Sequence, residues 1–417
     1  MTMIWKTRKL GDIFQIKPPK SETNRLGDTA HISFVPMEDL GILSTMFTAK
    51  KEKQLKEVIG KYTYFADNDV LLAKITPCFE NGKMGIARNL KNGVGFGSSE
   101  FIVFRSNGQV IPEYLFYILC TTNFREQGKK RMSGAVGHKR VQKEFIENYL
   151  IQFPESISEQ QHIVAILDKT FSAIVCAKEN AEKNIKNSQI LFKNYLGGVF
   201  KNKDNGWQTR KLGEICEMIN RGISPKYTTT DGVCVLNQKC IRDHKINFEL
   251  SRLHDFGSKK VSDDKFIQIG DVLINSTGTG TLGRVAQVKE LPFNATVDSH
   301  VTIVRPIKNM FYNDFFGYSL IFIEDEISKR GDGCGGQTEL ARNTLKHDFE
   351  ITYPKSLAEQ QRIASQLDFL SAETNKLETI YQAKINELEI LKESILQKAF
   401  SGKFTTENID IDSQVQA

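Results

Sequence analysis

The sequence predicts a mixed α/β (α+β) protein, in which two β-rich domains are separated by a long antiparallel two-helix coiled coil. Three observations predict this fold. Two stretches occur twice about 200 residues apart, β-branched runs recur in the same order in both copies, and each copy ends in a long amphipathic helix pattern. Two long repeats indicate an internal pseudo-twofold, because a solenoid needs several short repeats.

The repeated stretches mark the start and the end of each copy. Trp5 to Ile13 (WKTRKLGDI) returns at Trp207 to Ile215 (WQTRKLGEI), and Ile151 to Asp168 returns at Ile351 to Asp368. The chain is therefore divided into five segments. They are a first globular domain (residues 1–153), a first long helix (154–200), a second globular domain (201–353), a second long helix (354–403) and a C-terminal tail (404–417).

Short strands dominate both predicted domains. Runs of β-branched and aromatic residues, bounded by Gly, Asn and Asp, are typical of strands. They lie at 32–36, 69–74 and 101–105 in the first copy, and at 233–237, 271–276 and 301–305 in the second. A helix is predicted after each set, at 112–123 and at 311–328.

Each long helix opens with the pattern of a capping box. Ser156 and Ser356 each precede a glutamate by three residues, and apolar residues then follow at three- and four-residue steps. Each pattern covers about 40 residues, or roughly 60 Å of helix. The stripe is imperfect, so each helix needs a partner, and the helix of the other copy is the obvious one. The Gly197-Gly198 pair and Gly402 are predicted to end the helices.

Composition indicates an ordinary protein of the cytoplasm. The net charge is +6, which is compatible with a polyanionic partner without establishing one. The seven cysteines are odd in number and form no C-x-x-C pair, as expected for reduced cysteines in the cytosol. There is no apolar signal stretch and no run of 18 apolar residues, so no membrane segment is expected.

Catalytic motifs are scarce. Gly278 to Gly283 fits G-x-G-x-x-G, but strand-like residues follow it where a dinucleotide site needs a helix, so we interpret it as a hairpin turn. The seven histidines do not cluster at metal-ligand spacing. No phosphate loop, no nucleophile elbow and no Asn-Pro-Pro-Phe/Tyr tetrapeptide of adenine methyltransferases occurs. No catalytic residue and no metal site are therefore predicted.

What remains is binding chemistry in polar, Gly-rich loops. Lys, Arg, Asn and Ser bond phosphates and base edges, and glycine permits close backbone approach. The candidate DNA-binding residues are Lys74, Thr76, Lys83, Arg88, Ser99, His138, Lys139 and Arg140 in the first copy, and Asn275, Ser276, Thr277, Thr279, Arg284, Ser299, His300 and Gln337 in the second. The alternative is that these are ordinary solvated loops.

The doubled blocks resemble the specificity subunit of type I restriction–modification enzymes, over essentially the whole chain. The resemblance rests on the doubled W-x-T-x-K-L-G-[DE]-I start, the doubled P-x-S-x-x-E-Q-Q-x-I helix opening, and strand blocks such as Gly270 to Ile274 and Gly137 to Val141. It implies that each globular unit is a target recognition domain and that each reads one half of a split asymmetric DNA site. It also implies that the helices are spacers on which two adenine methyltransferase (modification) subunits dock.

The resemblance implies a non-catalytic subunit of a restriction endonuclease/adenine methyltransferase complex in the cytoplasm. Its implied partners are double-stranded DNA, the two methyltransferase subunits and restriction/translocase subunits, with no membrane. No cofactor is expected on this chain, because S-adenosylmethionine, ATP and Mg belong on the partner subunits.

Three alternatives stay open from the sequence. The nearest is the recognition subunit of a related non-type I restriction system that shares these domains. A single-chain DNA-modifying enzyme, such as a nuclease with metal-binding carboxylates, lacks a convincing motif here. A coiled-coil scaffold without a DNA role would not need two elaborate β-rich domains.

Overall fold

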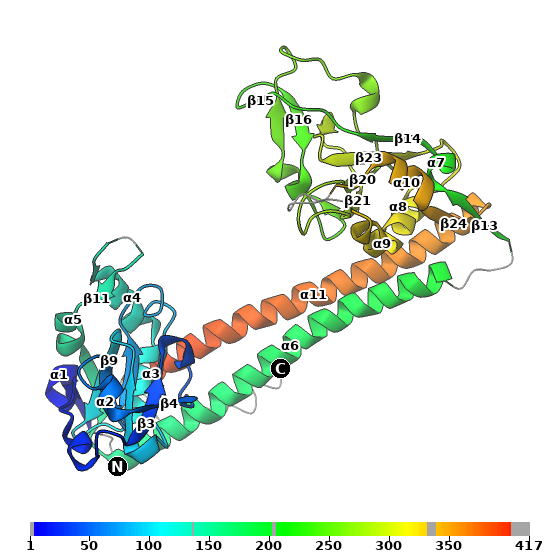
Figure 1. Ribbon diagram of the computed structural model, residues 1–417. Coiled ribbons are helices and arrows are strands. Elements are labelled where there is room, and N and C mark those ends of the chain that lie inside the picture. Colours follow the sequence, from blue (N-terminus) through cyan, green and yellow to red (C-terminus); the bar gives the residue numbers. More distant parts are fainter. Residues whose placement is uncertain (1–3, 136, 202–205, 332–338, 402–417) are drawn as a thin grey trace. The chain divides into compact units, whose positions relative to one another are not determined.

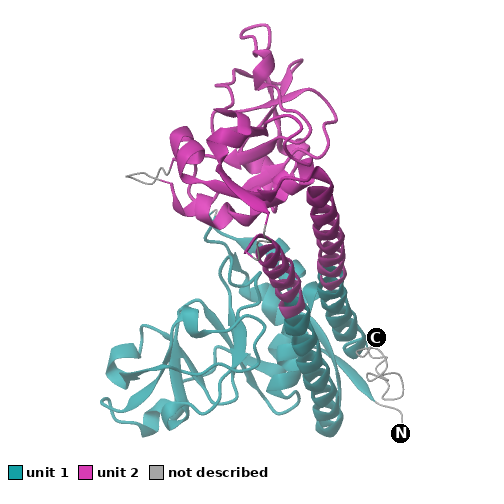
Figure 2. Cartoon of the chain, turned by 90° about the vertical axis from the view of Figure 1, so that its right-hand side faces the viewer, with its two compact units in different colours: residues 1–182, 382–417 teal, residues 183–381 magenta. Residues whose placement is uncertain are grey.

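The computed structural model describes residues 4–135, 137–201, 206–331 and 339–401 of the 417-residue chain. The chain forms two compact units (Figure 2). Unit 1 comprises residues 1–182 and 382–417, and unit 2 comprises residues 183–381. Each unit combines an α/β domain with one part of each long helix, and the predicted mixed α/β class is confirmed. In the described part of the chain, no helix is both long and apolar enough to cross a membrane.

The domain of unit 1 consists of short strands and helices, several of which are labelled in Figure 1. In chain order they are β1 (Trp5–Lys9), α1 (Leu10–Ile13), β2 (Phe14–Ile16), β3 (His31–Val35), β4 (Lys51–Gln54), α2 (Leu55–Val58), β5 (Thr63–Ala66), β6 (Val70–Ala73), β7 (Met84–Ile86), β8 (Val94–Gly97), β9 (Phe101–Ser106), α3 (Pro112–Cys120), α4 (Thr122–Lys130), β10 (Met132–Ser133), β11 (Arg140–Val141), α5 (Lys143–Asn148) and β12 (Leu150–Pro154). The long helix α6 (Ile157–Lys201) follows.

The domain of unit 2 repeats this plan with some additions. Its elements are β13 (Trp207–Lys211), α7 (Leu212–Ile215), β14 (Cys216–Arg221), β15 (Tyr227–Thr228), β16 (Val233–Leu236), β17 (Ile241–Arg242), β18 (Lys245–Ile246), β19 (Arg252–His254), β20 (Val272–Asn275), β21 (Val285–Gln287), β22 (Ala295–Val297), β23 (Val301–Pro306), α8 (Asn313–Phe322), α9 (Glu324–Lys329), α10 (Arg342–Asp348) and β24 (Glu350–Pro354). The second long helix is α11 (Leu357–Ala399).

The first sheet has the same topology in both units, and the second sheet shares three strands, β4-β3-β8 and β19-β16-β22, but has a different added edge strand in each unit. The first sheet has the strand order β2-β9-β6-β7 in unit 1 and β14-β23-β20-β21 in unit 2, and all its neighbouring strands are antiparallel. The second sheet has the order β4-β3-β8-β5 or β15-β19-β16-β22, and it contains one parallel pair, β3 with β8 or β16 with β22. The duplication seen in the sequence is therefore a duplication of the fold.

Strand β6 is buried on both faces. Val70 and Leu72 lie in a core that includes helix α3, whereas Leu71 and Ala73 lie in a second core that includes residues of β3 and β5. Side chains alternate between the two faces of a strand, so a strand covered on both faces needs an uninterrupted apolar run. This burial explains the apolar stretch that predicted the strand.

The repeated start and end of each copy pair with each other. Strand β1 pairs antiparallel with β12, with Trp5 opposite Pro154, and β13 pairs with β24, with Trp207 opposite Pro354. A Cβ atom at Gly213 in α7 would lie 3.0 Å from a carbonyl oxygen of helix α10, so the two short helices pack closely at this glycine. The two repeated motifs thus close each domain.

A repeated Asp–Arg pair fixes one end of the central strands. Asp271 accepts hydrogen bonds from Nε and Nη2 of Arg305 at 2.7 Å each, and Asp69 and Arg105 make the same bidentate pair at 2.8 Å. The hydrogen bonds with Asp271 raise the pKa of Arg305. The pair accounts for the aspartate that precedes each of the repeated strands β6 and β20.

A buried glutamine connects each domain to its own long helix. Gln360 is completely buried, accepts a hydrogen bond from Tyr312 N at 2.8 Å and donates one to Pro354 O at 2.9 Å. Gln160 makes the equivalent contacts in unit 1. The repeated Glu-Gln-Gln motif is therefore a joint between the domain and the helix as well as a helix start.

The beginning of α6 and the end of α11 lie side by side in unit 1, and so the helices run antiparallel there. Lys178 Nζ lies 2.6 Å from Glu389 Oε1, and Leu396 of α11 is buried in the core of the domain. In unit 2 the roles are exchanged, because Leu196 and Phe200 of α6 join the core of that domain. The predicted pairing of the two helices is confirmed within each unit.

Two polar residues that interrupt the apolar stripe form hydrogen bonds within their own helix. Ser188 and Thr374 are buried, and each hydroxyl donates to the carbonyl oxygen four residues earlier, at 3.0 Å and 2.9 Å. This bond lets a hydroxyl occupy a buried helical position without an unpaired donor. At the start of α11, Ser356 Oγ accepts from Glu359 N at 3.4 Å, which is one half of the predicted capping box.

The predicted helix end at Gly197-Gly198 is wrong, because α6 continues to Lys201. Each glycine costs about 1 kcal/mol relative to alanine inside a helix. Leu196 and Phe200 flank the pair and are buried in the core of unit 2, and Phe200 stacks on Phe322 with a centroid distance of 5.2 Å. Tertiary packing on both sides of the pair thus outweighs the local preference.

Candidate functional site

Polar loops gather in each unit at the ends of the central strands. In unit 1, backbone hydrogen bonds join the loop after β6 to the turn before β9 and to the segment before β11. Lys74 N donates to Glu100 O, and Thr76 N donates to Lys139 O, both at 2.9 Å. We call this region the unit 1 loop surface. It brings together Lys74, Thr76, Ser99, His138, Lys139 and Arg140 of the predicted residues.

The side chains of the unit 1 loop surface hold one another in place. Lys74 Nζ donates to Ser99 O at 2.9 Å, and Thr76 Oγ1 donates to Glu80 Oε1 at 2.9 Å. His138 and Lys139 are exposed. Exposed cations on an ordered backbone are suited to phosphate contacts.

Arg140 and Glu100 form a bidentate ion pair on this surface. Arg140 Nε lies 2.9 Å from one oxygen of Glu100, and Nη2 lies 2.8 Å from the other. The hydrogen bonds from Arg140 hold the pKa of Glu100 below its usual range. The side chain of Arg140 nevertheless stays 45% exposed. Glu100 is not among the residues predicted from the sequence.

A basic segment next to this surface was also missed. Lys129 and Lys130 lie in the last turn of helix α4, Arg131 is its C-cap, and all three are exposed; β10 then leads to the loop with His138 and Lys139. The Lys-Lys-Arg run was the available signal in the sequence. It adds exposed positive charge near the predicted residues.

Lys83 and Arg88 lie apart from one another. Lys83 is beside the loop surface at the base of the β6–β7 hairpin, but its Nζ donates to Met37 O at 2.7 Å. Arg88 follows the other end of β7 and is paired with Glu113 of α3. It lines a cavity of about 710 Å³ beside the start of α6. The structure therefore does not bring Arg88 to the loop surface.

The equivalent region of unit 2 is the unit 2 loop surface. Thr277 Oγ1 lies 2.7 Å from His300 Nδ1, and Gln238 Nε2 donates to Thr277 O at 2.6 Å. Arg284 Nη2 donates to Gly280 O at 3.0 Å. Ser299 is half-buried in the turn before β23, and Thr279 is exposed. Gln238 was missed because it lies about 40 residues before the loop it contacts.

Asn275 and Ser276 require a correction. Both were predicted to contact DNA, and both are 0% exposed. Ser276 Oγ lies 2.5 Å from Thr302 Oγ1, and Asn275 Nδ2 donates to Gln238 O at 3.2 Å. These buried side chains cannot reach a base edge, and their hydrogen bonds stabilise the loop instead. Gln337 lies outside the described residues.

The glycine-rich sequence at Gly278 to Gly283 is the loop between two antiparallel strands, β20 and β21. Gly283 has a φ of +86°, and a Cβ there would lie 2.6 Å from backbone of helix α9. The interpretation as a hairpin is confirmed. In the described residues, no group of three or more His, Cys, Asp or Glu side chains is placed to hold a metal ion.

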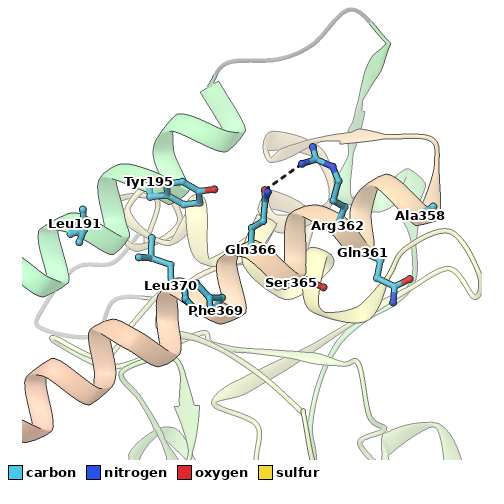
Figure 3. A pocket seen from close by; sticks show the side chains of 9 residues that line it. All are labelled: Leu191, Tyr195, Ala358, Gln361, Arg362, Ser365, Gln366, Phe369 and Leu370. Carbon is cyan, nitrogen blue, oxygen red and sulfur yellow. Dashed lines mark hydrogen bonds between the residues drawn. The ribbon is translucent and has the colours of Figure 1, made fainter.

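A second candidate surface lies on the long helices of unit 2. An apolar groove of about 790 Å³ lies between α6 and α11, and we call it the helix groove. Figure 3 shows the side chains that line it. Leu191 and Tyr195 of α6 and Phe369 and Leu370 of α11 contribute its apolar lining. The side chain of Phe369 is 70% exposed, which is unusual for an aromatic residue.

Comparison with known proteins gives the same family for both halves of the chain. Residues 4–187 and 204–389 each match the family described as type I restriction modification DNA specificity domain. The chain is also 32% identical, over 242 residues, to the specificity subunits of the type I restriction enzymes EcoEI and EcoAI of Escherichia coli. These matches cover 57% of this chain and 39% of each relative, so the chain spans well under half the length of those curated relatives.

Two solved structures have a similar fold. One is a chain from a study of complex assembly and conformational transition in the type I R-M system, with a TM-score of 0.79, 21% identity, and coverage of 96% of this chain and 98% of that chain. The other is the HsdS subunit from Thermoanaerobacter tengcongensis, with a TM-score of 0.62, 21% identity, and coverage of 96% and 97%.

Proposed function

Because the chain belongs to the family of type I restriction–modification DNA specificity domains, we propose that it binds a bipartite, asymmetric site on double-stranded DNA. Each domain reads one half of the site through its own loop surface. The chain is the specificity subunit, and it selects the sequence on which the rest of the complex acts.

The observation that carries this proposal is a shared framework with different side chains. Lys74 N bonds to the carbonyl of Glu100, and Ser276 N bonds to the carbonyl of His300 in the same way, at 2.9 and 2.8 Å. The backbone of the loop is thus kept, while the residue before the next strand changes from Glu100 in unit 1 to His300 in unit 2. Base edges are distinguished by side-chain donors and acceptors, so the two surfaces are suited to different sequences.

We propose that catalysis resides in partner subunits. Two adenine methyltransferase subunits and the restriction/translocase subunits would complete the complex and would bind S-adenosylmethionine, ATP and Mg. The chain itself holds polar and basic loops that suit DNA contact, and it would act in the cytoplasm. The named E. coli relatives are specificity subunits, which supports this division of labour.

The helix groove is the surface that best fits a methyltransferase subunit. Exposed apolar side chains rimmed by polar residues mark protein–protein contacts. Phe369 and Leu191 supply the apolar part, and Arg362 and Gln361 supply the polar rim. A partner on this groove would bind the helices through residues other than those of the loop surfaces.

The test is a methylation assay with and without partners. With S-adenosylmethionine and the methyltransferase subunits of its own system, the chain should direct N6-methylation of adenine within a two-part motif. The purified chain alone should transfer no methyl group and should cleave no DNA. Robust methyl transfer by the chain alone would contradict the proposal, and so would methylation that follows a single, undivided motif.

A further inference from the structure

Arg140 presents a fixed set of hydrogen-bond donors at the edge of the unit 1 loop surface. It forms an antiparallel bridge with Ile75, the residue after Lys74. Glu100 accepts hydrogen bonds from Nε and Nη2 of Arg140, and Nη1 of Arg140 donates to His138 O at 3.1 Å. A guanidinium has five N–H groups, so two remain for a ligand. The pairing with Glu100 prevents the long side chain from turning freely.

The equivalent position of unit 2 carries a carboxylate. Glu339 forms an antiparallel bridge with Thr277, and Leu340 N donates to Ser276 O at 2.8 Å. Arg221 Nη1 lies 2.6 Å from Glu339 Oε1, and Arg221 Nη2 donates to Leu340 O at 2.8 Å. The side chain of Glu339 stays 59% exposed. The carboxylate of Glu339 is therefore oriented by Arg221 and still accessible to a ligand.

Backbone pairing makes Arg140 and Glu339 the same position in two copies of one framework. The residue after each is a buried apolar side chain, Val141 or Leu340, whose N–H donates to the loop after the central strand. At this position unit 1 offers only donors and unit 2 offers only acceptors. Each charged group is oriented by an ion pair, Arg140 by Glu100 and Glu339 by Arg221.

In the major groove, guanine shows two acceptors, O6 and N7, and cytosine shows the N4 amino donor. On the basis of the proposed function, we propose that Arg140 reads a guanine in the half-site of the first domain and that Glu339 reads a cytosine in the half-site of the second. Glu100 and Arg221 are positioning residues, because each acts by orienting the reader beside it.

The experiment maps N6-methyladenine in DNA from cells that express the full chain with its own methyltransferase subunits. The variant Arg140→Gln should lower the preference for guanine at one position of one half-site by about 5- to 150-fold, with the other half-site unchanged. The variant Glu339→Gln should lower the preference for cytosine at one position of the other half-site. The preference for adenine at that position should rise, because a glutamine amide forms hydrogen bonds with adenine N6 and N7.

The matched control is Lys139→Gln, which removes the neighbouring exposed cation. A phosphate contact carries no sequence information, so this variant should weaken methylation at all sites and keep the motif. For a variant with too little methylation to map, competition binding of the purified complex to duplexes with each base substituted gives the same preference ratio.

The outcomes separate the two proposals. If the wild-type complex methylates no two-part motif, the proposed function fails. If the wild-type motif is two-part but both variants keep its base preferences, or the half-sites lack the G·C pairs, the assignment of Arg140 and Glu339 is overturned and the proposed function stands.

Discussion

At the scale of the residue, Gln360 does more than its place in a helix-start motif indicates. Its buried amide bonds to two backbone groups of the domain that lies against the helix, Tyr312 N and Pro354 O, and also to Met310 O. An unpaired buried polar group costs about 1–3 kcal/mol. The sequence showed that the glutamine is repeated, but it could not show that the side chain turns into the domain.

We predict that Gln360→Leu lowers the free energy of unfolding of unit 2 by about 3 kcal/mol or more, because three backbone groups lose their partner. The measurement is urea unfolding followed by the fluorescence of Trp207, with Trp5 replaced by phenylalanine so that unit 2 alone reports. The control is Gln361→Leu, since the adjacent glutamine is exposed. Equal effects of the two variants would contradict the role assigned to Gln360.

The candidate loop residues show why single residues are hard to assign from sequence. The repeat correctly placed Lys74 and Thr277 at the ends of central strands, and the structure brings both loops into ordered surfaces. It could not reveal that Asn275 and Ser276 are buried, because the inward or outward direction at a strand end depends on local register. Nor could it reveal Gln238, which reaches the loop from a short 3₁₀ helix, Gln238–Cys240, that follows β16.

At the scale of the element, the long helices were predictable because their pattern is long and regular. The predicted helix end at Gly197-Gly198 was wrong because the sequence shows the local stop signal but does not show that Leu196 and Phe200 are buried in the core of unit 2. For the exposed aromatic residue in the helix groove, the sequence carried no signal at all. Phe369 lies outside the buried stripe, and only the structure shows that it lines a surface groove.

We predict that Phe369→Gln weakens binding of the methyltransferase subunit by at least about tenfold, since buried aromatic anchors dominate protein–protein contacts. The unfolding free energy should change little, because the side chain is already 70% exposed. Binding is measured by titration of the full chain with the partner subunit in the absence of DNA. Phe256→Gln is the control, because Phe256 is exposed in the same unit and does not line the groove. An unchanged affinity of the Phe369 variant would place the partner elsewhere.

At the scale of the whole molecule, the duplication made the fold predictable. A motif that is weak in one copy becomes informative when the same order of motifs returns, and the confirmed strands and long helices follow from that order. The structure adds that each compact unit contains parts of both helices. The division of the chain at residues 153, 200, 353 and 403 stays a prediction about its segments.

The central claim is that the two domains are independent readers of two half-sites. They share the closing strands, the Asp–Arg pair and the buried glutamine, and they differ in the side chains of the loop surfaces. The most direct test replaces residues 1–153 with the matching domain of a relative and maps the methylated motif in the presence of the methyltransferase subunits. One half of the motif should change and the other half should stay as it was. A change in both halves, or in neither, would contradict the claim.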